Sequence, residues 1–141
     1  MARIKLSLPE NFTFSTQIPV RITDINYGNH LGNDAVLGLL HEARMQFLKA
    51  FNYSELNLGG VGLIMADVAI EFKAEAFYGD VLTAYVTAGE FTKVGFDIYY
   101  KLVKSEGGTA VALAKTGMVC FDYEKRKVAA VPEEVRLNWD K

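Results

Sequence analysis

The polar residues best suited to chemistry lie close together between residues 21 and 34. A short apolar stretch leads into this segment, which then places a carboxylate, an amide and an imidazole at Asp24, Asn26 and His30. Carboxylates and imidazoles transfer protons in enzymes, and amides hold water or a carbonyl group by hydrogen bonds. The segment therefore predicts a proton-transfer site, with Asp24, His30 and Asn26 as its candidate catalytic residues.

A long helix is predicted directly after this segment, over residues 35–51. Its apolar residues recur at three- and four-residue intervals, as in an amphipathic helix: Val36, Leu39, Leu40, Ala43, Phe47, Ala50 and Phe51. Asn33 or Asp34 is expected to cap its start through a short side-chain oxygen. Because the helix dipole favours negative charge there, the backbone N–H groups at this end are expected to bind an oxyanion. These groups belong to Leu31, Gly32, Asn33 and Asp34.

Each of these residues also has an ordinary structural interpretation. Asp24 stands where a strand ends, and it is equally suited to accepting hydrogen bonds from the backbone of a turn. His30 could simply hold the loop to the start of the helix. For Asn33 and Asp34, capping is favoured over catalysis. At the level of the sequence these alternatives stay open.

Other polar residues stand in apolar surroundings. Glu42 and Arg44 lie on the predicted helix and are expected to form structural ion pairs, because a buried charge needs a partner. Asp67 interrupts an otherwise apolar strand start and is therefore a further candidate site residue, to which the resemblance described below gives a role in substrate binding. His41 and Cys120 have no supporting neighbours in the sequence, so they are assigned to packing or to the surface.

Length and composition are those of an ordinary globular protein. The 141 residues are expected to form one domain, 1–141, and a net charge of −2 gives no basic footprint for nucleic acid. One cysteine and no export signal favour a cytoplasmic protein. No apolar run approaches the roughly 20 residues that span a bilayer. Two histidines without a cysteine cluster predict no metal site.

After the helix, the apolar period changes to two, which is typical of strands. Four long strands are predicted, at residues 63–77, 81–92, 95–105 and 109–123. One strand is expected before the helix, at 12–23, and a short one at 128–131. Residues 1–11 are expected to be a loose lead-in, and residues 54–58 a short helical turn. Because short turns join antiparallel neighbours, the sequence predicts an α+β fold in which a four-strand meander wraps the long helix.

Several short motifs occur in a recognisable order along the chain. They are Asp24-Ile-Asn26-Tyr-Gly-Asn29-His30-Leu-Gly32-Asn33, Glu42-Ala-Arg44, Gly79-Asp80 and Val131-Pro132-Glu133. In this order they resemble the motifs of hotdog-fold acyl-CoA thioesterases of the 4-hydroxybenzoyl-CoA thioesterase type. The resemblance implies a hotdog fold and a homodimer or homotetramer whose sheets join edge to edge. It also implies active sites at the subunit interface, an acyl-CoA substrate, and no cofactor apart from the coenzyme A of that substrate.

The resemblance bears on two candidate residues in particular. In relatives, the strand that corresponds to the one carrying Asp67 lines the acyl pocket, so Asp67 is expected near residues 24–30 of the partner subunit. The usual second Asp of the motif is Asn26 here, and the usual Gly before the histidine is Asn29. Because asparagine cannot take a proton, Asp24 or His30 is expected to activate the water. The plant acyl-carrier-protein thioesterases are similar in combining Asn and His with an acid.

The expected function is hydrolysis of an acyl-CoA to free acid and coenzyme A. Two alternatives remain at this level. One is an acyl-thioester hydratase or dehydratase on the same fold, whose spacing of Asp, Asn and His is approached by Asp24, Asn26 and His30. The other is a module that binds acyl-CoA without turning it over, as the replacement of the usual acid by asparagine would suggest.

Overall fold

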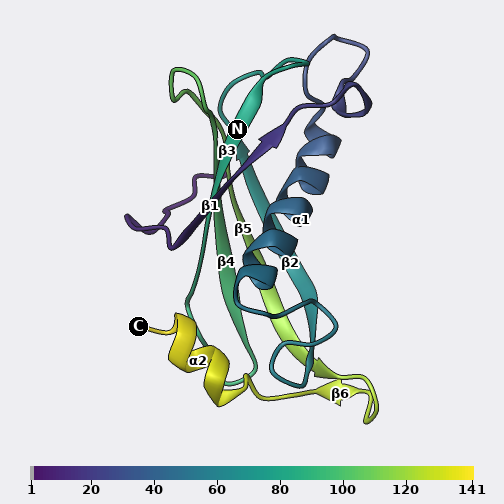
Figure 1. The fold of residues 1–141 in the computed structure, drawn as a ribbon, viewed down its shortest axis with the longest axis vertical. Coiled ribbons are helices and arrows are strands. Elements are labelled where there is room, and N and C mark those ends of the chain that lie inside the picture. Colours follow the sequence, from purple (N-terminus) through teal and green to yellow (C-terminus); the bar gives the residue numbers. More distant parts are fainter. Residues whose placement is uncertain (1) are drawn as a thin grey trace.

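A computed structural model describes residues 2–141 as an antiparallel sheet with a long helix against one face and a short helix at the C-terminus (Figure 1). This is the α+β hotdog architecture that was predicted. The elements in chain order are β1 (Phe14–Pro19), the 3-10 helix η1 (Ile22–Asp24), α1 (Asn33–Ala50), β2 (Gly62–Phe72), β3 (Val81–Gly89), β4 (Gly95–Lys104), β5 (Ala110–Asp122), β6 (Lys127–Val128) and α2 (Glu133–Trp139).

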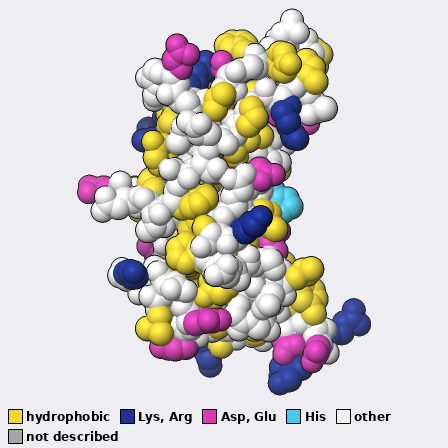
Figure 2. Space-filling view, viewed as in Figure 1, with side chains coloured by type: hydrophobic (Ala, Val, Ile, Leu, Met, Phe, Trp, Pro, Cys, Tyr) yellow, Lys and Arg dark blue, Asp and Glu magenta, His cyan; other side chains and the backbone are white. Residues whose placement is uncertain are grey.

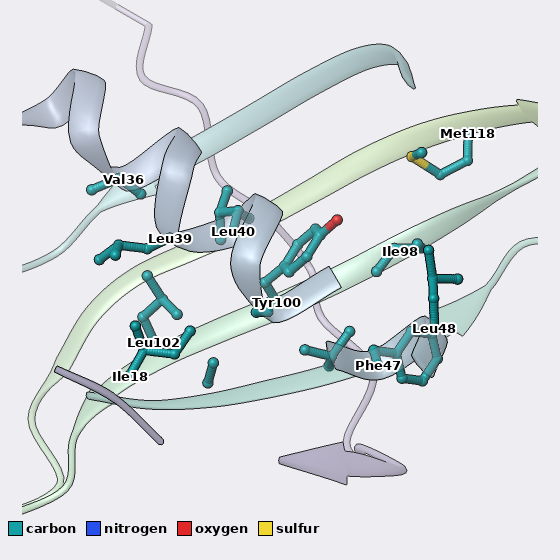
Figure 3. Packing of buried hydrophobic residues seen from close by; sticks show 14 of the residues in the cluster. Ile18, Val36, Leu39, Leu40, Phe47, Leu48, Ile98, Tyr100, Leu102 and Met118 are labelled. Carbon is teal, nitrogen blue, oxygen red and sulfur yellow. The ribbon is translucent and has the colours of Figure 1, made fainter. Parts of the chain in front are cut away.

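The long helix packs as the spacing of its apolar residues predicts. Most of the predicted stripe is buried, and Phe47 is completely so. Leu48, which lies outside the stripe, is also completely buried. Both side chains meet residues of β4 that point toward the helix, among them Ile98 and Tyr100 (Figure 3). Each fully buried side chain of this size contributes about 1.5–3 kcal/mol, so the interface between α1 and the sheet is a main source of stability.

The order of the strands corrects one prediction. They run β1-β3-β4-β5-β2, with β6 paired to β5, and every pairing is antiparallel. Only β3, β4 and β5 form a meander, because β2 pairs with β5 and not with β3. β1 lies at one edge of the sheet. Pro19 is tolerated there because an edge strand can lack one N–H donor without breaking a hydrogen bond to a neighbouring strand.

The connection between β2 and β3 explains this order. Residues 73–80 carry the chain from one edge of the sheet toward the other. They are held in place by the N–H groups of Leu31 and Val20, which donate to the carbonyls of Ala76 and Asp80 at 2.8 Å each. Ala76 is buried. The connection therefore packs directly beside the segment that leads into α1.

Two further predictions differ from the structure. Residues 54–58 are not helical; Ser54 and Asn57 instead exchange backbone hydrogen bonds in a tight loop. The predicted last strand ends at Val128, and α2, which was not predicted, follows it. Trp139 of α2 stacks on Phe47 with ring centroids 4.9 Å apart. The short helix thus closes the end of the core away from the start of α1.

The surface mixes side chains of both charges. In Figure 2, acidic, basic and hydrophobic side chains are scattered over the visible face, and charged groups gather over the turn between β5 and β6. Residues 2–11 form no helix or strand, in agreement with a loose lead-in, and lie over the sheet face opposite α1. Neither helix within residues 2–141 is long and apolar enough to cross a membrane.

Candidate functional site

Asp24 organises the entry to the segment between β1 and α1. Its carboxylate is buried and accepts a hydrogen bond from the backbone N–H of Arg21 at 2.9 Å, while the guanidinium of Arg21 lies 3.4 Å away. The carbonyl of Asp24 accepts from the N–H of Gly32 at 3.0 Å. Asp24 therefore closes the 3-10 turn and ties it to the start of α1. Arg21 was missed as its partner, although opposite charges three residues apart are a usable signal.

Hydrogen bonds of Asn26 stabilise the loop between η1 and α1, residues 25–32. Its backbone N–H donates to the carbonyl of His30 at 2.9 Å, and its Oδ1 accepts from the N–H groups of Gly28 at 2.9 Å and His30 at 3.4 Å. Asn29 has φ = 66°, a left-handed conformation that Gly and Asn adopt more readily than other residues. Asn29 therefore supplies the positive φ that this turn requires. The loop is ordered by its own hydrogen bonds.

One ring nitrogen of His30 makes a hydrogen bond to the backbone, and the other is free within residues 2–141. Its Nδ1 lies 3.2 Å from the carbonyl oxygen of Leu31. Because a carbonyl only accepts, Nδ1 must carry the proton in this contact. In the neutral ring Nε2 then bears the lone pair. A Cβ added to Gly28 would lie 3.4 Å from Nε2, so this nitrogen faces the glycine side of the loop.

The start of α1 leaves backbone donors unused. Gly32 is the N-cap residue, and no side chain caps the helix, so the predicted capping by Asn33 or Asp34 is wrong. The N–H groups of Leu31 and Gly32 already donate to carbonyls of the chain. Those of Asn33 and Asp34 make no hydrogen bond with any group in residues 2–141. Of the four donors expected at this end, two are therefore free for a ligand.

Asp67 lies away from these groups, on the sheet face opposite α1. Its carboxylate accepts from the N–H of Gly117 and from Nζ of Lys115, both at 2.9 Å. Thr116, between these two residues on β5, points toward α1, where it bonds Tyr100, so its neighbours point the other way. The hydrogen bond from Lys115 lowers the pKa of Asp67. An ion pair thus explains the acid in an apolar strand.

A polar network crosses the interface between α1 and the sheet. Nε of Arg44 donates to Glu55 at 2.9 Å, and Nη1 donates to the hydroxyl of Tyr100 at 3.1 Å. That hydroxyl also bonds Thr116 at 2.7 Å, and His41 lies 2.8 Å from Glu55. Burial disfavours the charge of Arg44, but its partners outweigh burial and raise its pKa. Glu55 was missed because its partners stand far from it in the sequence.

The ion-pair prediction is confirmed for Arg44 and wrong for Glu42. The carboxylate of Glu42 is exposed and accepts only from Gln46, at 2.8 Å, with no cation beside it in the described chain. Cys120 is buried, as expected of a packing residue, and burial raises the pKa of its thiol to about 11. Its thiol is therefore not a nucleophile at neutral pH. Nowhere in residues 2–141 do three His, Cys, Asp or Glu side chains gather as metal ligands would.

Taken together, the site is a short ordered loop and the first turn of a helix. The loop presents Nε2 of His30 and the amide of Asn26, and the helix presents two unused N–H groups. Asp24 supports the loop from beneath, and Asp67 lies on the other side of the sheet. Such an arrangement can hold a water molecule and a carbonyl oxygen that gains negative charge.

Comparison with known proteins identifies the family and the fold. Residues 20–138 match the profile of the Thioesterase-like superfamily. A predicted esterase from Aquifex aeolicus (strain VF5) is 30% identical over 96 residues, which are 67% of this chain and 72% of that protein. Two solved structures share the fold. Slr0204, a 1,4-dihydroxy-2-naphthoyl-CoA thioesterase from Synechocystis, is 25% identical with a TM-score of 0.79, covering 87% of this chain and 92% of its own.

The second structure, of the thioesterase superfamily from Jannaschia sp. CCS1, is 18% identical with a TM-score of 0.82, and the match covers 93% of this chain and 83% of the other. At that identity the likeness concerns the fold alone. The family profile, in contrast, spans η1, the loop, α1 and the whole sheet beyond β1. The chain therefore belongs to the Thioesterase-like superfamily.

Proposed function

We propose that this protein hydrolyses acyl-CoA thioesters to the free acid and coenzyme A. The observation that carries the proposal is the pair of unused N–H groups, on Asn33 and Asp34, beside a loop whose His30 has a ring nitrogen free. Thioester hydrolysis needs a bound water near the carbonyl carbon and donors for the carbonyl oxygen as it becomes an oxyanion. The loop and the helix start offer both kinds of group.

In this proposal His30 holds the attacking water through Nε2. The carbonyl oxygen of the substrate lies at the N–H groups of Asn33 and Asp34, where the helix dipole adds to their effect. One donor to an oxyanion is worth about 10²–10³-fold in kcat. Asp24, whose carboxylate already binds the backbone of Arg21, supports the loop. We accordingly assign it a positioning role and leave Asp67 out of the site.

Coenzyme A enters only as part of the substrate, and no further cofactor is proposed. The choice of a CoA thioester is supported by the Synechocystis relative, whose described substrate is an aromatic acyl-CoA. The choice of hydrolysis over hydration is supported by the match to the Thioesterase-like superfamily. In addition, the carboxylate of Asp24, which the hydratase alternative would use, already accepts a hydrogen bond from the backbone N–H of Arg21.

Self-association to a homodimer or homotetramer is part of the proposal. β2 is an edge strand, and several of its hydrophobic side chains are exposed in the single chain: Ile64, Met65, Val68 and Phe72. Long apolar edges promote pairing with another strand. Pairing of β2 with β2 of a second copy would cover these side chains and join the two sheets edge to edge.

Assays of the purified protein against a panel of acyl-CoAs and enoyl-CoAs test the function. Hydrolysis releases thiol, measured with a thiol reagent, whereas hydration changes double-bond absorbance without releasing thiol. Binding measured by calorimetry with neither signal would indicate a non-catalytic module. We expect thiol release, and we expect His30→Gln to lower kcat by about 100-fold or more with little loss of stability.

A further inference from the structure

Asp34 has lost the structural role that the sequence suggested for it. Its carboxylate does not cap α1 and makes no hydrogen bond or ion pair within residues 2–141. It also folds back over the start of the helix, because a Cβ added to Gly32 would lie only 2.6 Å from Oδ1 of Asp34. An exposed and unpaired carboxylate thus lies beside the loop that bears the proposed site.

Asn26 lies on the same side of Gly32. The added Cβ would be 3.5 Å from Cβ of Asn26, so the side chains of Asp34 and Asn26 both approach the Cα of Gly32. On its other side, Asn26 is a neighbour of His30, because a Cβ added to Gly28 would lie 3.3 Å from Oδ1 of Asn26 and 3.4 Å from Nε2 of His30. The three side chains therefore follow one another along the loop, with the amide in the middle.

We infer that Asp34 is the catalytic carboxylate of this protein and supplies from the helix the acid that Asn26 lacks. The inference rests on the proposed thioester hydrolysis. Asp34 takes a proton from the water held by His30, and the oxygen of that water bonds to the carbonyl carbon. The carbonyl π electrons move to the oxygen, and the oxyanion is held by the two free N–H groups.

The reaction then completes without a further reactant. The oxyanion reforms the C=O bond, the C–S bond breaks, and the thiolate of coenzyme A takes the proton back from Asp34. Before attack the negative charge is on Asp34, and afterwards it is on the oxyanion. Both positions lie at the N-terminus of α1, so the helix dipole favours one negative charge throughout. The base and the oxyanion are never charged together.

Other carboxylates fit this role less well. That of Asp24 is buried and bound by Arg21. That of Asp67 points to the far face of the sheet. Glu42 lies more than two turns farther along α1, where Gln46 donates to it.

The test combines a loss with a rescue. Asp34→Asn keeps the size of the side chain and removes its basicity, and kcat for an acyl-CoA that the wild type hydrolyses should fall by about 10²–10⁴-fold. Glu42→Gln is the matched control, since it removes an exposed carboxylate from the same helix, and its kcat should stay within about twofold of wild type. Asn26→Asp in the Asp34→Asn background should recover at least about tenfold. Asn26 uses only its oxygen in the loop, so Asp keeps those bonds.

Each outcome has one meaning. Loss in Asp34→Asn with recovery on adding Asn26→Asp supports the assignment. An Asp34→Asn protein that keeps more than about a third of the wild-type kcat overturns it. Loss without recovery also overturns it, because a carboxylate at position 26 would then not serve the same water. If the wild type releases thiol from no acyl-CoA, the proposed function itself fails, and that failure is seen before any variant is made. Circular dichroism confirms folding, and Asp34→Ser provides a second variant without a base.

Discussion

Removing the hydroxyl of Tyr100 is the clearest single test of how α1 is held to the sheet. Tyr100 lies between α1 and the sheet (Figure 3) and is completely buried. Its hydroxyl accepts from Arg44 at 3.1 Å and bonds Thr116 at 2.7 Å. Tyr100→Phe keeps the ring but leaves a buried guanidinium N–H and a buried hydroxyl without their partner. A bond to a charged group is worth about 1.5–3 kcal/mol and a neutral one about 0.5–1.5 kcal/mol, so the free energy of unfolding should fall by about 2–4 kcal/mol.

Denaturant unfolding followed by fluorescence measures this loss. The single tryptophan, Trp139, stacks on Phe47 of α1 and reports the same core. For a chain of this length the midpoint of thermal unfolding should fall by about 6–12 °C. Tyr99→Phe is the matched control, because its hydroxyl reaches only Asp97 on the other sheet face, and it should cost less than about 0.5 kcal/mol. Equal stability of Tyr100→Phe and wild type, or an equal loss in both variants, would refute the reasoning.

Burial disfavours ionised Glu55, but hydrogen bonds from His41 and Arg44 outweigh it and hold its pKa below the ordinary 4.5. The ionised Glu55 therefore stabilises the fold fully above pH 4.5, and this contribution is lost as the pH falls through the lowered pKa. The difference in free energy of unfolding between wild type and Glu55→Gln should accordingly narrow from about pH 7 to about pH 3. A difference that stays constant over this range would contradict the prediction. Gly117→Ala would place a Cβ 2.5 Å from Oδ1 of Asp67. It should therefore lower the free energy of unfolding by about 1–2 kcal/mol in wild type but by little in an Asp67→Ala background. An equal loss in both backgrounds would show that this clash is not the cause. Sedimentation at micromolar concentration should give a dimer or tetramer, and a 15.7 kDa species alone would count against the β2 interface.

Periodicity predicted the elements well where they are long and bury one face. The helix predicted at 35–51 is α1, and each of the four long predicted strands has a counterpart, although the first of them, predicted at 63–77, already ends at Phe72. Periodicity does not say which strands pair, and the position of β2 beside β5 depends on contacts of residues 73–80 that are distant in sequence. The seven residues of α2 are too few for a helical period to stand out. Pro132, followed by two acids, was the only signal of its start.

For the candidate site, the sequence predicted the segment but not the role of each residue in it. Asp24 ends η1, and Asn26 and His30 lie in the loop that follows it, beside the start of α1. Their roles depend on hydrogen bonds that the residue types leave open. Asp24 had two interpretations, and its contact with the N–H of Arg21 favours the structural one. Asp34 was expected to be a cap because it precedes the apolar stripe, but the helix begins at Asn33, two residues before its predicted start, which places Asp34 inside the first turn.

Asp67 illustrates a limit that no period-two pattern can remove. With strict alternation, Asp67 would lie on the same face of β2 as Leu63 and Met65, which is the face toward α1 and any acyl pocket beside it. The pairing with β5 shifts between Met65 and Asp67, because Ala66 is inserted as a bulge. One extra residue reverses the phase of the strand, so Met65 and Val68 both face α1 while Asp67 faces Lys115. The bulge thus lets the strand keep its apolar residues toward the helix and still place an acid between them on the other side.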